Sequence, residues 1–128
     1  MDTIEVFEAA VSDHSGEATF DQGASTAMGH LADSGELKVQ MVCLDDMLSE
    51  GKISPPDYIK VDVEGAEFLA LSGARNLLAE YHPILFLDTH NREAHQATIR
   101  LLEDLGYCFE VLDSKPIAET KELIARFS

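Results

Sequence analysis

The sequence is poor in basic residues and has no long apolar run. Only nine of its 128 residues are Lys or Arg, against 24 Asp or Glu, so the formal net charge is −15. This excess of negative charge repels phosphate backbones and anionic lipid headgroups, so we expect neither nucleic acid nor a membrane surface as a partner. No apolar segment approaches the roughly 18 residues of a membrane span, and the first residues lack the basic start of a signal peptide. We therefore expect a cytoplasmic protein.

Cysteine and the common catalytic motifs are also scarce. The two cysteines, Cys43 and Cys108, lie far apart in apolar stretches and match no zinc-binding or redox spacing, so we predict two buried free thiols. The sequence has no P-loop, no G-x-G-x-x-G turn, no G-x-S-x-G elbow and no H-E-x-x-H helix. The enzyme classes that these motifs mark have no support here.

The residues that are present suit a soluble globular protein. Apolar residues make up 45% of the chain and charged residues 26%, which is enough to build a core under a polar surface. A chain of this length fits one domain, spanning residues 1–128.

The first part of the chain predicts two strands and a short helix. Alternating and then continuous apolar residues favour a strand over 4–11, followed by a turn over 12–17. A segment rich in Gly, Ser and Ala predicts a surface loop over 22–36. A second strand is expected over 38–44, and Asp45 is placed to cap the short helical turn after it.

The rest of the chain alternates strands and helices. Strands are expected over 58–64, 83–87 and 107–113, and helices over 66–81, interrupted at Gly73, and over 91–106. The fully apolar segment 83–87 is typical of a strand buried on both faces, with helices on either side. This order predicts an α/β doubly wound fold with a mostly parallel sheet.

The periodicity of the C-terminal tail permits two structures, a helix over 117–125 or a strand over 122–127. We favour a loop followed by a short edge strand.

Polar residues gather where two of the predicted strands end. Asp62 and Glu64 share one side of the first strand, and Gly65 permits a sharp turn directly after them. Asp88 and His90 follow the second strand. If the two strands are neighbours, these side chains share one cleft, in which Asp62 or His90 can act as a base. A divalent metal on Asp62 with Asp88 or His90 is compatible by ligand type, but no spacing supports it, so we predict no metal site.

A structural interpretation of the same residues stands beside the catalytic one. Acidic residues at strand ends often cap the next helix or accept hydrogen bonds from loop amides, and we expect that role for Glu64. The histidines outside the strand ends lie in polar turns or on helix surfaces and are expected to be solvated. They are His14, His30, His82 and His95.

Several segments together resemble one enzyme family. IKVDVEGAEFLALSGA at 59–74 resembles the hallmark K-[IV]-D-[VI]-E-G-x-E segment of FkbM-type S-adenosylmethionine-dependent methyltransferases, which ends the fourth strand of the class I methyltransferase sheet. AAVSDHSGEATF at 9–20 is similar to the family's strand-three segment, and VCLDDML at 42–48 to the segment before strand four. PILFLDTH at 83–90 occupies the place of strand five, and LLEDLGYCFEVL at 101–112 resembles the helix and strand that follow it.

The resemblance implies a partial Rossmann-like class I methyltransferase sheet and an enzyme that transfers a methyl group from S-adenosylmethionine to a hydroxyl of a small molecule or sugar. Ser12 and Asp13 are expected near the adenine end of the cofactor. Asp62, Glu64 and Gly65 are expected to flank the methyl-transfer cleft.

The resemblance covers only the second half of such a domain, roughly residues 5–113. The family's glycine-rich cofactor loop and the acidic residue that ends strand two would both precede Met1, so we expect this chain alone to bind the cofactor weakly or not at all. Asp88 stands where the family leads us to expect the longer Glu.

The alternative is a non-catalytic binding or assembly module derived from a methyltransferase. A sheet without its central strands exposes an apolar edge beside the strand-four segment, and such edges recruit partners or self-associate. A homo-oligomer is therefore expected for this alternative.

Overall fold

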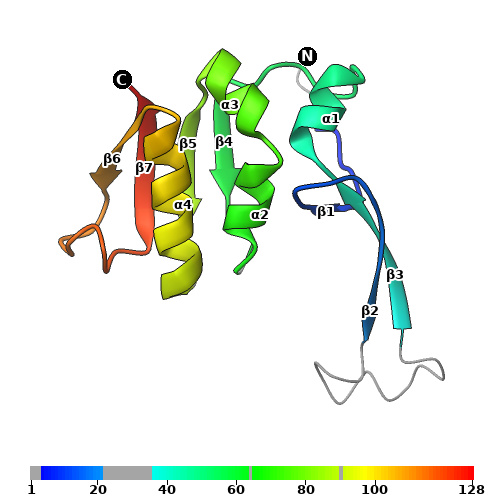
Figure 1. Ribbon diagram of the computed structural model, residues 1–128, viewed down its shortest axis with the longest axis horizontal. Coiled ribbons are helices and arrows are strands. Elements are labelled where there is room, and N and C mark those ends of the chain that lie inside the picture. The colour runs from blue at the N-terminus through cyan, green and yellow to red at the C-terminus, as the bar shows by residue number, and fades with distance from the viewer. Residues whose placement is uncertain (1–3, 22–35, 64, 90) are drawn as a thin grey trace.

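The computed structural model describes residues 4–21, 36–63, 65–89 and 91–128, which hold seven strands and four helices. The strands form two separate sheets, one of order β1-β3-β2 and one of order β4-β5-β7-β6 (Figure 1). In chain order the elements are β1 (Ala10–Val11), β2 (Gly16–Asp21), β3 (Glu36–Val42), α1 (Leu44–Ser49), β4 (Tyr58–Val61), α2 (Glu67–Ser72), α3 (Arg75–Tyr81), β5 (Ile84–Asp88), α4 (Arg92–Asp104), β6 (Tyr107–Val111) and β7 (Glu122–Phe127).

The N-terminal sheet is smaller than the sequence pattern predicts. The strand expected over 4–11 is wrong except for β1, because residues 4–8 form no regular structure and are exposed, with Ile4 at 92%. They have no neighbouring strand among the described residues, and an alternating pattern forms a strand only where it can pair and pack. β3 pairs in parallel with β1 and antiparallel with β2. The loop predicted over 22–36 lies almost wholly outside the described residues.

The four-stranded sheet is mixed. β4 and β5 run parallel with Val61 opposite Leu87, whereas β7 lies between β5 and β6 and is antiparallel to both. The α/β class is confirmed, but the pairing in this sheet is mixed rather than mostly parallel, and the edge position expected for the last strand is wrong. The connection over 112–121 turns the chain back after β6, and β7 then enters the sheet, where it buries Leu123 and Ala125.

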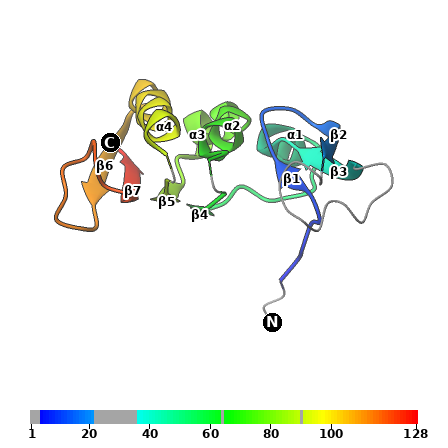
Figure 2. The same cartoon turned by 90° about the horizontal axis from the view of Figure 1, so that it is seen from below.

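The helices cover one face of this sheet. Seen from below, α2, α3 and α4 lie on the same side of β4, β5 and β7, and no described helix covers the opposite face (Figure 2). The burial of β5 therefore alternates: Leu85 and Leu87 are buried under the helices, whereas Phe86 is 36% exposed. The expectation of helices on both faces, with a strand buried on both, is wrong for the part of the chain that the structure describes.

The core between sheet and helices is aliphatic. Leu71 of α2, Leu77 and Leu78 of α3, and Leu102 of α4 are fully buried against Leu85 of β5. The helix predicted over 66–81 is interrupted at Gly73 as expected and forms α2 and α3. This packing fixes the positions of β4 and β5, the two strands that end at the candidate site.

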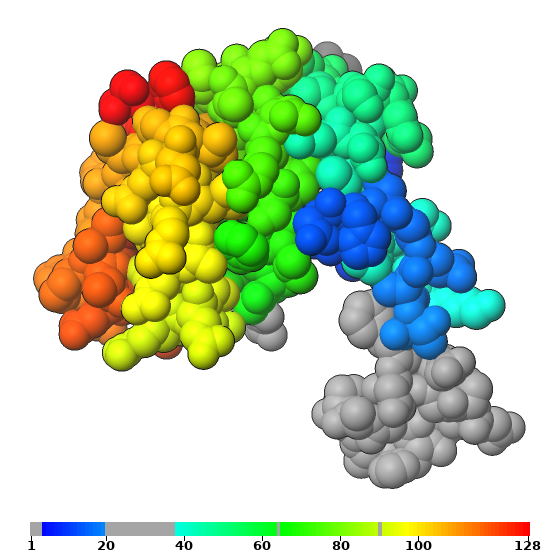
Figure 3. All heavy atoms as spheres, viewed as in Figure 1, coloured from blue at the N-terminus to red at the C-terminus, as the bar shows by residue number. Residues whose placement is uncertain are grey.

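Gly73 is the point where the N-terminal segment meets the helices. A Cβ atom at this position would clash with the carbonyl oxygen of Ser12 and lie 3.0 Å from the Cα of Asp13 and 3.2 Å from the Sγ of Cys43. In the space-filling view the segment between β1 and β2 lies against α2 (Figure 3). The absence of a side chain at Gly73 allows this contact.

Asp45 caps a helix, but not the one that the sequence predicts. Its two carboxylate oxygens accept the backbone N–H groups of Asn76, at 3.0 Å, and Leu77, at 2.8 Å, in the first turn of α3. The N-cap of α1 is Cys43, which has no side-chain capping hydrogen bond. Asp45 therefore ties α1 to α3 through a tertiary contact.

The two cysteines differ. Cys43 is a buried free thiol, as predicted, and its Sγ donates to the carbonyl oxygen of Gly73 at 2.9 Å. Cys108 is also free, but it is exposed, because it points to the bare face of the sheet on a strand that the sequence suggested was buried. In the described segments no helix has the length and apolar character that crossing a membrane requires.

Candidate functional site

The carboxyl ends of β4 and β5 lie side by side, as the sequence predicts for neighbouring strands. Gly65 follows β4 with φ at +93°, a conformation that side chains with a Cβ rarely adopt. A Cβ at Gly65 would lie 3.3 Å from the side-chain nitrogen of Asn91, which begins α4. The turn after β4 and the turn after β5 therefore pack directly on each other.

A buried carboxylate holds the turn after β4. Glu67 is 0% exposed, and its Oε2 accepts the backbone N–H of Gly65 at 2.8 Å. From the sequence we expect a carboxylate that binds loop amides here, but the expected residue is Glu64, which lies outside the described residues. The sequence holds a feature that points to Glu67: it is an acidic residue at the first position of α2, directly after the Gly65 turn.

Asp62 and Asp88 occupy adjacent positions at the two strand ends. Val61 is paired with Leu87, so the residues after them come next in the parallel register. Asp62 is exposed and Asp88 half-buried. A pocket of about 490 Å³ on the bare face is lined by Asp88, Lys60 and Phe86 among others, but not by Asp62. The cleft expected to join Asp62 and Asp88 to Glu64 and His90 stays a prediction, because the latter two lie outside the described residues.

The two predicted parts of the cofactor site lie at opposite ends of α2. Gly65 precedes this helix, whereas Ser12 and Asp13 pack on Gly73 at its other end. Ser12 is buried, and its hydroxyl donates to Asp13 at 3.3 Å. The ring of His14, 2.7 Å from Asp13 Oδ1, lowers the pKa of that carboxyl, and the Ser12 hydroxyl adds to this effect. Their cofactor role stays a prediction.

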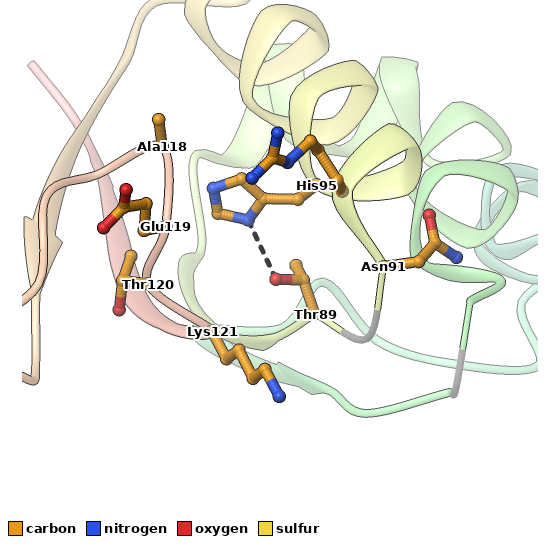
Figure 4. Close-up of a pocket in the computed structure, with 8 residues that line it drawn as sticks. Thr89, Asn91, His95, Ala118, Glu119, Thr120 and Lys121 are labelled. Carbon is orange, nitrogen blue, oxygen red and sulfur yellow. Dashed lines mark hydrogen bonds between the residues drawn. The ribbon is translucent and has the colours of Figure 1, made fainter.

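The position of His95 differs from the one that its sequence pattern predicts. It was expected to be solvated on a helix surface, but it is only 4% exposed because the segment before β7 folds over α4. Nε2 lies 2.7 Å from the carbonyl oxygen of Ile117, which can only accept, so Nε2 carries a proton. Nδ1 lies 2.8 Å from the hydroxyl of Thr89, so both ring nitrogens are within hydrogen-bond distance of a partner (Figure 4).

His95 belongs to the wall of a second pocket, which we call the β5–α4 pocket. It has a volume of about 260 Å³ and lies between Thr89 at the end of β5, the first turns of α4 and residues 118–121 before β7 (Figure 4). Arg92 and Lys121 supply positive charge there, and Glu119 supplies negative charge. Within the described ranges, no group of three or more His, Cys, Asp or Glu side chains could hold a metal ion.

The comparisons with known proteins agree with the motif at the end of β4. The family model described as the methyltransferase FkbM domain matches residues 2–109. The chain belongs to the FkbM methyltransferase family. The family resemblance seen in the sequence is thereby confirmed.

A curated relative of this FkbM domain is similar over a shorter stretch. The hexuronic acid methyltransferase AglP of Haloferax volcanii is 30% identical over 70 residues, which cover 53% of this chain and 29% of that protein. The chain thus matches less than a third of the relative's length. No solved structure matches the chain.

Two aspartates of the FkbM-like segment VCLDDML have structural roles. Asp45 caps α3, and Asp46 accepts the hydroxyl of Ser15 at 2.8 Å, which fixes the turn between β1 and β2. Neither lies at the carboxyl ends of β4 and β5, so the candidate chemistry of this FkbM domain concentrates around Asp62, Gly65 and the β5–α4 pocket.

Proposed function

We propose that this chain forms the acceptor side of an S-adenosylmethionine-dependent methyltransferase that methylates a hydroxyl of an acidic sugar. The turn from β4 into α2 carries the proposal. There Gly65 takes a positive φ, its N–H is held by buried Glu67, and exposed Asp62 precedes it. Membership of the FkbM family supports methyl transfer, and the relative named as a hexuronic acid methyltransferase supports a sugar acid as acceptor.

The residues at this turn fit a positively charged methyl donor. When bound, S-adenosylmethionine supplies an electrophilic methyl carbon on a sulfonium, which departs as a neutral sulfide with the bonding electron pair. The Asp62 carboxylate would favour this cation over the neutral product and would accept the proton that the sugar hydroxyl loses. Glu67 fixes the backbone of the turn at Gly65, three residues after Asp62.

Asp62→Asn tests the proposal, with Asp57→Asn as its matched control. Both changes remove one exposed carboxylate next to β4, but Asp57 lies at the opposite end of the strand. The assay uses the protein as it is expressed in its native cell. We expect Asp62→Asn to lower methyl transfer to a sugar acid about 10²-fold or more, while the free energy of unfolding changes by about 1 kcal/mol. Asp57→Asn should leave both unchanged.

A structural Asp62 gives the opposite pattern. The melting temperature of Asp62→Asn would then fall, while the activity per folded molecule stayed at the wild-type value. Asp88→Asn extends the test. A loss of turnover like that of Asp62→Asn supports a shared cleft, and a wild-type turnover assigns Asp88 to the scaffold.

One observation favours the alternative, a non-catalytic assembly module. β4 is the last strand of its sheet in the described part of the chain, and Tyr58 on it is 65% exposed and lies 6.3 Å, centroid to centroid, from the ring of Phe86. An unpaired strand beside exposed aromatic rings is a surface on which a second copy can add. Sedimentation equilibrium tests this alternative, since a monomer at high protein concentration refutes it and a dimer weakened by Tyr58→Lys supports it.

A further inference from the structure

We propose that the β5–α4 pocket binds the carboxylate of the acceptor sugar, with Arg92 and Lys121 as its ligands, an inference that rests on the proposed function. An acidic sugar meets a chain of net charge −15, which repels it at a distance. Such an acceptor needs a locally positive site to bind. The pocket supplies one, because two of the nine basic residues of the chain line it.

Among the residues that the structure describes, the positive charges of this pocket form no ion pairs. No carboxylate of the described residues lies within 4.0 Å of the charged groups of Arg92 or Lys121. A guanidinium can hold a carboxylate through two parallel hydrogen bonds, and an ammonium adds a point charge. The pair therefore offers the chemistry that a sugar carboxylate needs.

Three other pockets of the described residues lack this excess of positive charge. The pocket on the bare face holds Lys60 against Asp88 and Glu122. A pocket beside α1 holds Asp45 and Glu80 with no Lys or Arg. A groove further along α4 pairs one arginine with one glutamate. Only in the β5–α4 pocket, among these four, do the cations outnumber the carboxylates.

The wall of the pocket is fixed before any ligand binds. The ring of His95 is held at both nitrogens, by Thr89 and by the Ile117 carbonyl. The backbone N–H of Thr89 donates to the carbonyl oxygen of Lys121 at 2.9 Å, which joins the end of β5 to the segment before β7. A wall held in this way loses little conformational entropy when a ligand enters.

The location and the size of the pocket match one end of a sugar ring. Asn91 lies both in the lining of the pocket and against the Gly65 turn, so the pocket adjoins the turn that carries Asp62. A volume of about 260 Å³ is small for a whole ligand, so we expect it to take the carboxylate end of a sugar whose remaining ring extends toward β4. With the negative charge of Glu119, the Lys, Arg and Glu side chains of the pocket sum to one positive charge. This net charge suits a monoanionic carboxylate better than a dianionic phosphate.

Binding of D-glucuronate tests the assignment, with D-glucose as the neutral control. The two sugars share a ring and differ in one carboxylate. We expect glucuronate, but not glucose, to shift the imidazole signals of His95 in NMR titrations and to bind about 10-fold or more tightly than glucose. The variant Arg92→Gln with Lys121→Gln should lose this preference, and Arg92→Lys, which keeps the charge but not the planar fork, should lose part of it.

Arg100→Gln is the matched control variant, because it removes one positive charge from the same helix outside this pocket. All changed side chains are exposed, so we expect unchanged melting temperatures. Equal binding of the two sugars, or an Arg100→Gln variant that loses as much preference as the pocket variant, overturns the assignment.

Activity separates this inference from the function on which it rests. A protein that methylates no sugar refutes the proposed function. A protein that methylates glucuronate with a kcat/KM that the pocket substitutions leave unchanged overturns the pocket assignment alone. A rise in KM for glucuronate with little change in kcat in the pocket variant supports it.

Discussion

Tyr107 makes the stability of this fold dependent on pH in the alkaline range. Its ring is 3% exposed at the start of β6, and its hydroxyl donates to the carbonyl oxygen of Pro83 at 2.7 Å. Burial raises the pKa of Tyr107 from 10.0 to about 12, because the interior disfavours the phenolate. The folded state therefore binds this proton more tightly than the unfolded state does.

The sign and size of the effect follow from this difference in pKa. The stabilisation of the folded state by Tyr107 is fully present below a pH of 10.0, the pKa of the residue in the unfolded chain. It is lost as the pH rises from there to the folded-state pKa of about 12. A difference of about two pKa units corresponds to about 3 kcal/mol of unfolding free energy. Tyr107→Phe removes the titration, and it costs about 1 kcal/mol or more at neutral pH because the Pro83 carbonyl loses its donor.

Urea unfolding at a series of pH values measures the prediction. The chain has no tryptophan, so far-ultraviolet circular dichroism is the suitable signal. We expect wild type to be the more stable protein at about pH 8 and Tyr107→Phe to be the more stable one at about pH 12. Tyr81→Phe, which removes an exposed hydroxyl, is the control and should follow the wild-type curve. A constant difference between wild type and Tyr107→Phe over this range would refute the reasoning.

Two further substitutions test contacts that join distant parts of the chain. Gly73→Ala should lower the unfolding free energy by about 1–3 kcal/mol, because its Cβ would press on the backbone of Ser12 and Asp13; a rise in melting temperature would contradict this close approach. Asp45→Asn should cost about 1 kcal/mol in urea unfolding, since one of two acceptors and the negative charge at the start of α3 are lost. Asp46→Asn, which alters a single bond to the Ser15 hydroxyl, should cost less, and equal losses would count against the capping role.

The order of most elements and the position of the turn at Gly65 could be predicted from the sequence because both depend on local interactions. Apolar periodicity located β4, β5, α4 and β6, and Gly65 stands where the chain turns with a positive φ. The family could likewise be predicted from the sequence, since its motif is a contiguous segment around that turn.

Contacts between distant segments decided the rest. The position of β7 between β5 and β6 depends on which strand edges are available for pairing. The local residue pattern of the tail does not predict this choice. The same folding of the segment before β7 over α4 buries His95, which resembles a surface residue in its helix, and creates the β5–α4 pocket. Asp45 caps α3 across 31 positions of sequence, and Glu67 binds the turn once α2 is packed. The sequence by itself determined which short segments become strands, turns and helices, because those depend on neighbours along the chain, whereas the tertiary structure alone decided which side chains are buried together, because that depends on how the whole chain packs.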